Sequence, residues 1–223
     1  MTIGDTHHLI KNRESIMRSP VVFGVKRSIA EKLGWIGKSV SVRDILTAAK
    51  NEKLRLMMTS ATQSNSGASA YFGFLYAFAR PNSVLTAENL RDPAVRDSVK
   101  ELLKSINRTS ESSGWLRDLF AKDYDRYDGM FNYESHIIEL NQNLVKSNRE
   151  PLQVIYPTPG LGIADFPFSY LDRGDQQKSD IFAKLEEFLL STPVQKELAA
   201  KGRRVGPVGT TPGTVDLAVF NPD

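Results

Sequence analysis

The sequence predicts an α/β protein with a largely parallel sheet, in which short strands alternate with helices. Apolar runs of four to seven residues, such as Ser19–Val25 and Leu54–Met58, are typical of buried strands. Longer segments between them place apolar residues at helical spacing, and glycine or proline separates many of the segments. This alternation favours a sheet covered by helices. With 223 residues, the chain is long enough for one large domain or two small lobes.

The first half of the chain contains six expected elements. Pro20 is tolerated at the start of a strand, Gly34 stops a helix, and Ser41 is placed to cap the next one. In chain order, we expect a strand at Ser19–Val25, helices at Lys26–Leu33 and Val42–Ala49, a strand at Leu54–Met58, and helices at Ala70–Ala79 and Pro93–Asn107.

The second half continues the alternation. A proline- and glycine-rich connector, PTPGLGIAD, separates two of its strands, and the residues after Gly202 read as a loop with one short strand. In chain order, we expect a loop at Ser110–Gly114, a helix at Trp115–Lys122, a strand at Gly129–Asn132, a helix at Glu134–Ser147, strands at Leu152–Tyr156 and Phe166–Leu171, and a helix at Asp180–Leu190 with an extension to Gly202.

Composition restricts the classes of function. The net charge is only +3 and the basic residues are spread along the chain, which argues against nucleic acid as the main partner. The absence of cysteine excludes disulfides, thiolate metal sites and a cysteine nucleophile. No apolar run reaches the roughly 20 residues that a membrane span requires. The polar start of the chain, MTIGDTHHLIKNRES, does not resemble a signal peptide.

A loop rich in hydroxyl groups leads into the apolar helix Ala70–Ala79 and forms the main candidate for a binding site. A helix N-terminus offers unpaired backbone N–H groups and about half a positive charge. Gly67 would let the backbone approach a ligand, and Ser69 alone would suffice as a helix cap. Because capping needs only one or two such residues, the loop is interpreted as an oxyanion site. Its hydrogen-bonding residues are Thr59, Ser60, Thr62, Ser64, Asn65, Ser66 and Ser69.

Other motifs do not support catalysis or a metal. An acidic segment from Asp123 to Glu134 has the length of a calcium loop, but Tyr127 occupies a ligand position and Gly129 falls one place late. The sequence gives no obvious hydrolase triad around His136, and no G-x-S-x-G motif is present. We therefore expect no catalytic residue, no metal site and no cofactor.

An ordered set of segments resembles the type 2 extracytoplasmic solute-binding proteins, the receptor components of ABC importers. The segments are SPVVFGVKRSIAEKLGW, MTSATQSNSGASA, YDGMFNYES, VIYPTPGLGIADFPFSYL and FLLSTPVQKELAAKGRRVG. The resemblance is strongest to the oxyanion-binding branch and to solute-binding modules joined to a von Willebrand A domain. It implies a non-enzymatic receptor outside the cytoplasm, with a small anion as ligand and an ABC permease or a fused domain as partner.

The family fold implies two α/β lobes joined by crossover strands that close on a ligand by hinge motion. Residues 40–156 would form the second lobe, and residues 1–39 with 157–223 would form part of the first lobe and the hinge. Only about eighteen residues precede Ser19, where the family has two or three β-α units, so the resemblance implies that the first lobe is incomplete.

The resemblance also implies ligand contacts. The first choices are Ser64, Asn65, Ser66 and Gly67, followed by Thr59 and Ser60 at the end of the preceding strand. Ser19 would contribute from the crossover strand, although the residue before Pro20 is also an ordinary strand start. Tyr133 would be a cleft tyrosine or an edge aromatic, and Thr158 is a weaker candidate. Glu134 would either point into the cleft or stabilise the first turn of its helix.

Two other functions remain open at this point. The chain is also consistent with an interaction module of a cell-surface protein whose cleft is vestigial. A cytosolic effector-sensing domain of a transcription regulator would share the fold, but no helix-turn-helix segment precedes it here.

Overall fold

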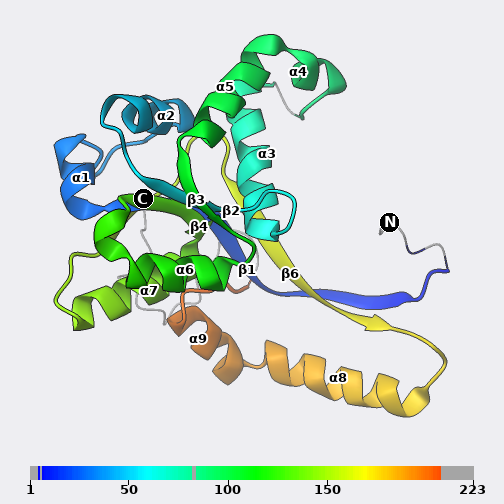
Figure 1. Ribbon diagram of the computed structural model, residues 1–223. Helices are drawn as coiled ribbons and strands as arrows, with labels where there is room; N and C mark the ends of the chain where they lie inside the picture. Colours follow the sequence, from blue (N-terminus) through cyan, green and yellow to red (C-terminus); the bar gives the residue numbers. More distant parts are fainter. Residues whose placement is uncertain (1–4, 6, 82–83, 207–223) are drawn as a thin grey trace. The chain divides into compact units, whose positions relative to one another are not determined.

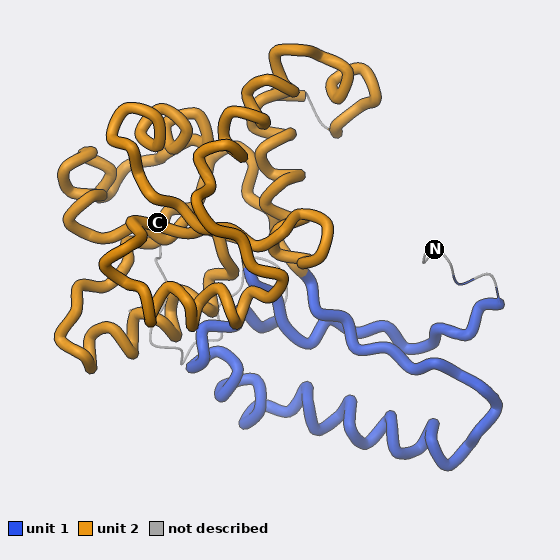
Figure 2. Tube along the Cα trace, viewed as in Figure 1, with its two compact units in different colours: residues 1–19, 165–220 blue, residues 20–164, 221–223 orange. Residues whose placement is uncertain are grey.

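The computed structural model describes residue 5, residues 7–81 and residues 84–206, and it divides into two compact units (Figures 1 and 2). Unit 1 comprises residues 1–19 and 165–220, and unit 2 comprises residues 20–164 and 221–223. Each unit is described by itself. The expected strand in residues 207–223 lies outside the described residues.

A mixed sheet forms the centre of unit 2. Its strand order is β3-β2-β4-β1-β5, and β6 pairs with β1 beside this path. Strand β2 runs parallel to both β3 and β4, whereas β1 runs antiparallel to β4 and β5. The strands are β1 (Ile10–Lys26), β2 (Leu56–Thr59), β3 (Ile106–Ser110), β4 (Gly129–Tyr133), β5 (Leu152–Ile155) and β6 (Gly162–Leu171).

The prediction of a largely parallel sheet is therefore correct for β3-β2-β4 and wrong for the pairs that β1 makes with β4 and β5. A strand buried on both faces reads as a continuous apolar run whichever way it points, so its direction is not visible in the sequence.

Helices in unit 2 form where the sequence offers good termini. Ser41 and Asp44 form a reciprocal capping box at the start of α2, and Pro93 occupies the first turn of α5. The elements are α1 (Arg27–Lys32), α2 (Val42–Asn51), α3 (Asn65–Ala79), α4 (Ala87–Arg91), α5 (Pro93–Lys104), α6 (Ser113–Lys122), the 3-10 turn η1 (Tyr124–Arg126) and α7 (Glu134–Lys146).

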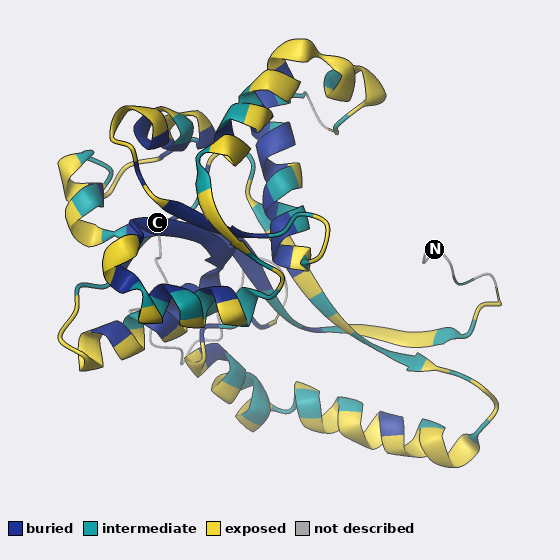
Figure 3. Cartoon of the chain, viewed as in Figure 1, coloured by how far each residue is buried: buried dark blue, intermediate teal, exposed yellow. Residues whose placement is uncertain are grey.

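Helices cover the sheet on both faces. Met130 of β4 packs in one cluster with Leu116 of α6 and Ile137 of α7. The next residue, Phe131, instead contacts the ring of Phe74 in α3, with centroids 4.9 Å apart. Since successive strand residues point to opposite faces, α6 and α7 lie on one side and α3 on the other. Strands β2 and β4 are fully buried (Figure 3).

Two glycines let the chain cross α3 at backbone contact distance. A Cβ atom on Gly73 would lie 2.0 Å from the carbonyl oxygen of Gly160, and a Cβ on Gly160 would lie 2.4 Å from that of Gly73. Gly160 also has a φ of 111°, which side chains other than glycine rarely adopt. The connector after β5 can follow α3 only because both positions lack a side chain.

Unit 1 contains the first part of β1, the last part of β6, and helices α8 (Gln176–Leu190) and α9 (Thr192–Ala200). Phe182 of α8 stacks on Phe168 of β6 at 4.5 Å. Another face of α8 is uncovered by described residues, with exposed fractions of 58% at Ile181, 43% at Leu185 and 60% at Phe188. We name these three side chains the α8 stripe.

Several predicted boundaries are wrong. β1 begins at Ile10 rather than Ser19, and β6 takes in residues 162–165 of the expected connector. The short helix α4 was not expected, and residues assigned to a helix end and a loop form β3. These segments are mostly polar and partly or fully exposed, so they lack the apolar pattern that marks a buried element. No described helix is long and apolar enough to cross a bilayer.

Candidate functional site

Three strand-to-helix turns meet at one edge of the sheet in unit 2. Because β3, β2 and β4 are parallel, their carboxyl ends lie along the same edge, and the chain passes from them into α6, α3 and α7. In open α/β sheets, ligands bind in the crevice outside the carboxyl ends of the strands. We call this region the carboxyl edge, and it is the candidate site.

A chain of hydroxyl groups connects the end of β2 to the start of α3. The Oγ1 atom of Thr59 lies 2.7 Å from the Oγ of Ser66, which in turn lies 3.1 Å from the Oγ of Ser64. Thr59 and Ser66 are each 1% exposed. The structure brings these three residues together, and their hydroxyls bond to one another, so their direct part in holding a ligand stays a proposal.

The N-cap side chain of α3 makes no hydrogen bond to a backbone N–H group of the first turn. α3 begins at Asn65 rather than at Ala70, and its N-cap is Ser64 rather than the predicted Ser69. The Ser64 side chain bonds to the Ser66 hydroxyl instead of a first-turn N–H group. By contrast, Ser112 caps α6 by accepting a bond from the N–H of Trp115. The Ser64 side chain therefore does not satisfy a backbone donor at the start of α3.

The packing of α3 against the preceding loop requires a glycine at position 67. A Cβ atom there would lie 2.3 Å from the carbonyl oxygen of Ser60 and 2.5 Å from that of Thr59. The absence of a side chain at Gly67 is thus explained by the close approach of the preceding loop, and its predicted approach to a ligand stays a prediction.

A hydrogen bond connects two of the three turns. The Asn65 side-chain amide donates to the Tyr133 hydroxyl at 2.9 Å, from the first residue of α3 to the last residue of β4. Tyr133 is 6% exposed, and Asn65 is exposed. This contact places the predicted residues Asn65 and Tyr133 side by side at the carboxyl edge.

The third turn contributes a backbone bond and a pocket. The N–H of Ser60 donates to the carbonyl of Ser110, at the end of β3, at 2.8 Å. Beside them lies a pocket of about 380 Å³, in which Glu111 is the ionisable residue. Its lining consists of Met58, Thr59, Ser60, Ala61, Gln63, Leu103, Ile106, Thr109, Ser110 and Glu111.

Glu134 is fully buried, and its carboxylate accepts a hydrogen bond from the hydroxyl of Tyr156. This contact lies at the first turn of α7, where an acidic side chain is also favoured by the helix dipole. Thr158 is exposed, and its hydroxyl donates to the carbonyl of Tyr156 at 3.2 Å. Ser19 is fully buried in the part of β1 that belongs to unit 1, so it is not grouped with the others.

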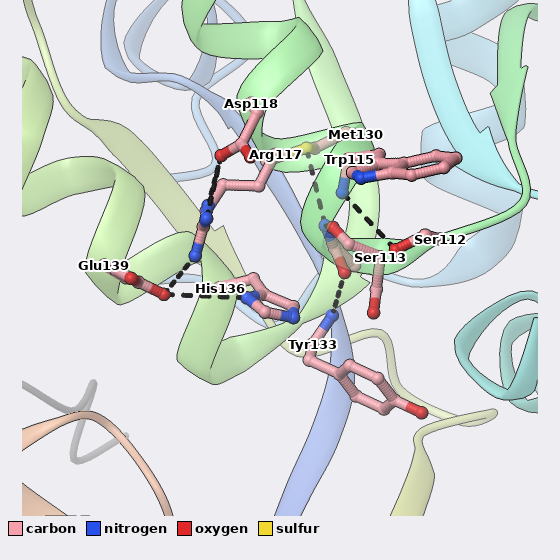
Figure 4. A network of polar contacts seen from close by, with 10 residues as sticks. Ser112, Ser113, Trp115, Arg117, Asp118, Met130, Tyr133, His136 and Glu139 are labelled. Atoms are coloured by element: carbon pink, nitrogen blue, oxygen red, sulfur yellow. Dashed lines mark hydrogen bonds and ion pairs between the residues drawn. The ribbon is translucent and has the colours of Figure 1, made fainter.

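The start of α6 presents residues that the sequence analysis did not select (Figure 4). Asn132 of β4 donates to the carbonyl of Ser113 at 2.9 Å and accepts from the N–H of Tyr133 at 2.8 Å. The indole of Trp115 is 69% exposed. Trp115 was missed because β3 was not recognised, so the turn that follows β3 was not placed at the carboxyl edge. Asn132 was not selected although its strand, β4, was predicted.

The selected site residues are mostly neutral hydrogen-bond donors and acceptors. The residues that the sequence selected contain hydroxyls, one amide and the buried carboxylate of Glu134, and none of them is cationic. Among the described residues, no cluster of three potential metal-binding side chains occurs. This arrangement can bind a small polar solute through directional hydrogen bonds.

The family follows from a model match that covers most of the chain. Residues 3–204 match the family described as bacterial extracellular solute-binding protein, and the chain belongs to this family. Its members are solute-binding proteins, in agreement with the prediction that the chain is not an enzyme. No curated protein matches the chain.

Solved structures share the fold at low sequence identity. The periplasmic binding protein AfuA from Actinobacillus pleuropneumoniae, with fructose-6-phosphate bound, is 15% identical with a TM-score of 0.60, over 92% of this chain and 59% of its own. The tagatose-bound solute-binding protein from Thermotoga lettingae is 16% identical with a TM-score of 0.60, over 88% and 54%.

The maltose-bound protein MalE3 from T. maritima is 13% identical with a TM-score of 0.61, over 92% of this chain and 57% of its own. These likenesses show the mixed α/β fold of periplasmic binding proteins. The chain spans little more than half the length of these structures.

Proposed function

We propose that the chain is a receptor module that captures a small solute at the carboxyl edge and delivers it to an ABC importer or a fused sensor domain outside the cytoplasm. The observation that carries this proposal is the meeting of three strand-to-helix turns, with the first turn of α3 uncapped by its N-cap side chain, in a chain of the solute-binding family. Membership of the family supports capture rather than catalysis.

For the ligand, we propose a small oxyanion. The first-turn N–H groups of α3 carry partial positive charge, and hydrogen bonds to a charged acceptor contribute about 1.5–3 kcal/mol each. Several such bonds are enough for micromolar binding, about −8 kcal/mol. The nearby hydroxyls of Ser60 and Ser64 are neutral donors of the same kind.

A second candidate is a neutral solute rich in hydroxyl groups. The exposed indole of Trp115 favours it, because an aromatic face that is open to solvent offers a flat apolar surface to a sugar ring. The absence of cationic groups among the predicted site residues is also consistent with an uncharged ligand. Fructose-6-phosphate, tagatose and maltose, bound in the similar structures, are suitable probes.

The test is a thermal-shift panel of phosphate, sulfate, molybdate and these three sugars, measured on the chain and on the variant Asn65→Asp. A ligand at 100 times its dissociation constant adds about 2.7 kcal/mol to the free energy of unfolding. Asn65 is exposed at the first position of α3, where an acidic residue stabilises the helix, so the variant folds but repels an anion. We expect an oxyanion to stabilise the parent chain and to lose this effect in Asn65→Asp.

Gln177→Asp is the matched control, because it places the same charge in the first turn of α8, in unit 1. It should leave the shifts unchanged. A sugar shift that survives Asn65→Asp and is lost in Trp115→Ala would support the second candidate instead. If no panel member stabilises the chain, capture by this chain alone is contradicted.

A further inference from the structure

A second pocket lies at the opposite edge of the same three strands. Its volume is about 260 Å³, and its lining consists of Arg55, Asn107, Arg126 and Tyr127. Arg55 directly precedes β2, Asn107 is the second residue of β3, and Tyr127 lies two residues before β4. The pocket therefore sits where the three parallel strands begin. We call it the amino-edge pocket.

Arg55 is held in a fixed orientation. Its Nε and Nη2 atoms donate to the two carboxylate oxygens of Asp128, at 3.1 Å and 2.8 Å, and the backbone N–H of Arg55 donates to the same carboxylate at 2.8 Å. Asp128 is 9% exposed. This pairing raises the pKa of Arg55 above its ordinary value, chiefly through the hydrogen bond with Asp128. Among described residues, no acceptor is recorded for its Nη1 atom.

Asn107 is also oriented by the fold. Its Oδ1 atom accepts a hydrogen bond from the backbone N–H of Leu56 at 2.7 Å. This contact is possible because Asn107 lies at the register shift between β2 and β3, where Leu56 pairs with Ile106 and Met57 with Arg108. With its oxygen occupied, the side chain has its amide nitrogen left as the donor group. No described residue is recorded as an acceptor for that nitrogen.

Arg126 supplies a second guanidinium at the mouth of the pocket. Its side chain is 73% exposed, and its ion pair with Asp123 is long, at 3.6 Å. The guanidinium lies over the ring of Tyr127, 6.0 Å from the centroid. Tyr127 is only 8% exposed, so its ring is held in place by the fold and supports the Arg126 guanidinium.

We propose that the amino-edge pocket binds a small oxyanion of the phosphate type, free or as part of a larger solute. Two guanidinium groups and an amide donor line one cavity, and no acidic residue is among its lining. Guanidinium groups match the oxygens of phosphate in pairs. Asp128 and Asp123 offset the charge of the two arginines, so the expected dissociation constant is about 1 mM. This site is independent of the proposed capture at the carboxyl edge.

The experiment is a titration with inorganic phosphate at low ionic strength, followed by nuclear magnetic resonance of the Asn107 side-chain amide and the Arg55 and Arg126 Nε–H groups. Low salt is needed because screening weakens exposed charges. We expect saturable shifts of these signals. Arg126→Gln should raise the dissociation constant about tenfold, as expected for the loss of a charged hydrogen bond.

Asn107→Asp is the second variant, because it keeps the acceptor for Leu56 but replaces the donor with a negative oxygen. It should abolish binding. Arg96→Gln is the matched control, since Arg96 is exposed on α5 and its replacement removes the same positive charge. Asn65→Asp should leave this titration unchanged, which separates the pocket from the carboxyl edge. The proposal is overturned if the pocket signals do not saturate, or if Arg96→Gln weakens binding as much as Arg126→Gln.

Discussion

Replacing Gly73 with alanine is expected to lower the free energy of unfolding by about 3 kcal/mol, the largest stability change predicted for unit 2. A glycine inside a helix usually gains up to about 1 kcal/mol on becoming alanine. Here, the added Cβ would lie 2.0 Å from the carbonyl oxygen of Gly160, which is backbone and cannot rotate away. Relief requires the connector after β5 to move off α3. Urea denaturation measures the change.

Gly114→Ala is the matched control for this substitution. Gly114 lies near the start of α6, and a Cβ there would meet only the Ser112 hydroxyl, at 3.8 Å. This variant should be neutral or slightly more stable, by about 0.5 kcal/mol. If Gly73→Ala is as stable as Gly114→Ala, the result would contradict a close contact between the connector and α3 at Gly73.

Replacing Asp128 with asparagine is expected to lower the free energy of unfolding by about 2 kcal/mol at neutral pH. The carboxylate accepts three hydrogen bonds from Arg55, and the variant keeps the shape but loses the charge. Because the Arg55 side chain is 48% exposed, solvent screens part of the attraction. The effect should therefore come mainly from the hydrogen bonds rather than from the long-range charge.

The same substitution changes how stability depends on pH. Burial alone would raise the pKa of Asp128, but the hydrogen bonds from Arg55 outweigh it and hold the pKa below the ordinary 3.8. A lowered folded-state pKa gives stability that is present above the unfolded pKa and lost as pH falls through the folded pKa. The difference between the parent chain and Asp128→Asn should therefore shrink below about pH 4.

Urea denaturation at several pH values between neutrality and pH 3 measures this dependence. The control Asp97→Asn removes an exposed carboxylate on α5 and should leave stability nearly unchanged throughout. A constant difference between Asp128→Asn and the parent chain at all pH values would contradict the assigned pairing.

The sequence was sufficient for the buried elements of unit 2 and insufficient for the polar ones. β2 and β4 are apolar and fully buried, so their patterns were clear. β3, INRTS, is a polar strand at the edge of the β3-β2-β4-β1-β5 path, and nothing in its residues distinguishes it from a loop. Its pairing with β2 arises from tertiary contacts, which single-sequence patterns do not contain.

For the candidate site, the hydroxyl-rich segment predicted which residues gather but not what they contact. Thr59, Ser64 and Ser66 are brought together as expected, yet their hydroxyls bond to one another. The start of α3 was placed five residues too late, because serine and asparagine favour caps over helix interiors. The contact between Asn65 and Tyr133 depends on strand order, which the sequence did not reveal.

The α8 stripe has a consequence for how the chain behaves in concentrated solution. Three large apolar side chains exposed on successive turns of one helix favour self-association, because withdrawing such a surface from water lowers the free energy of the system. Salts that strengthen this tendency, such as ammonium sulfate, should therefore salt the chain out early. A polar residue at Phe188 should shift that precipitation to a higher salt concentration.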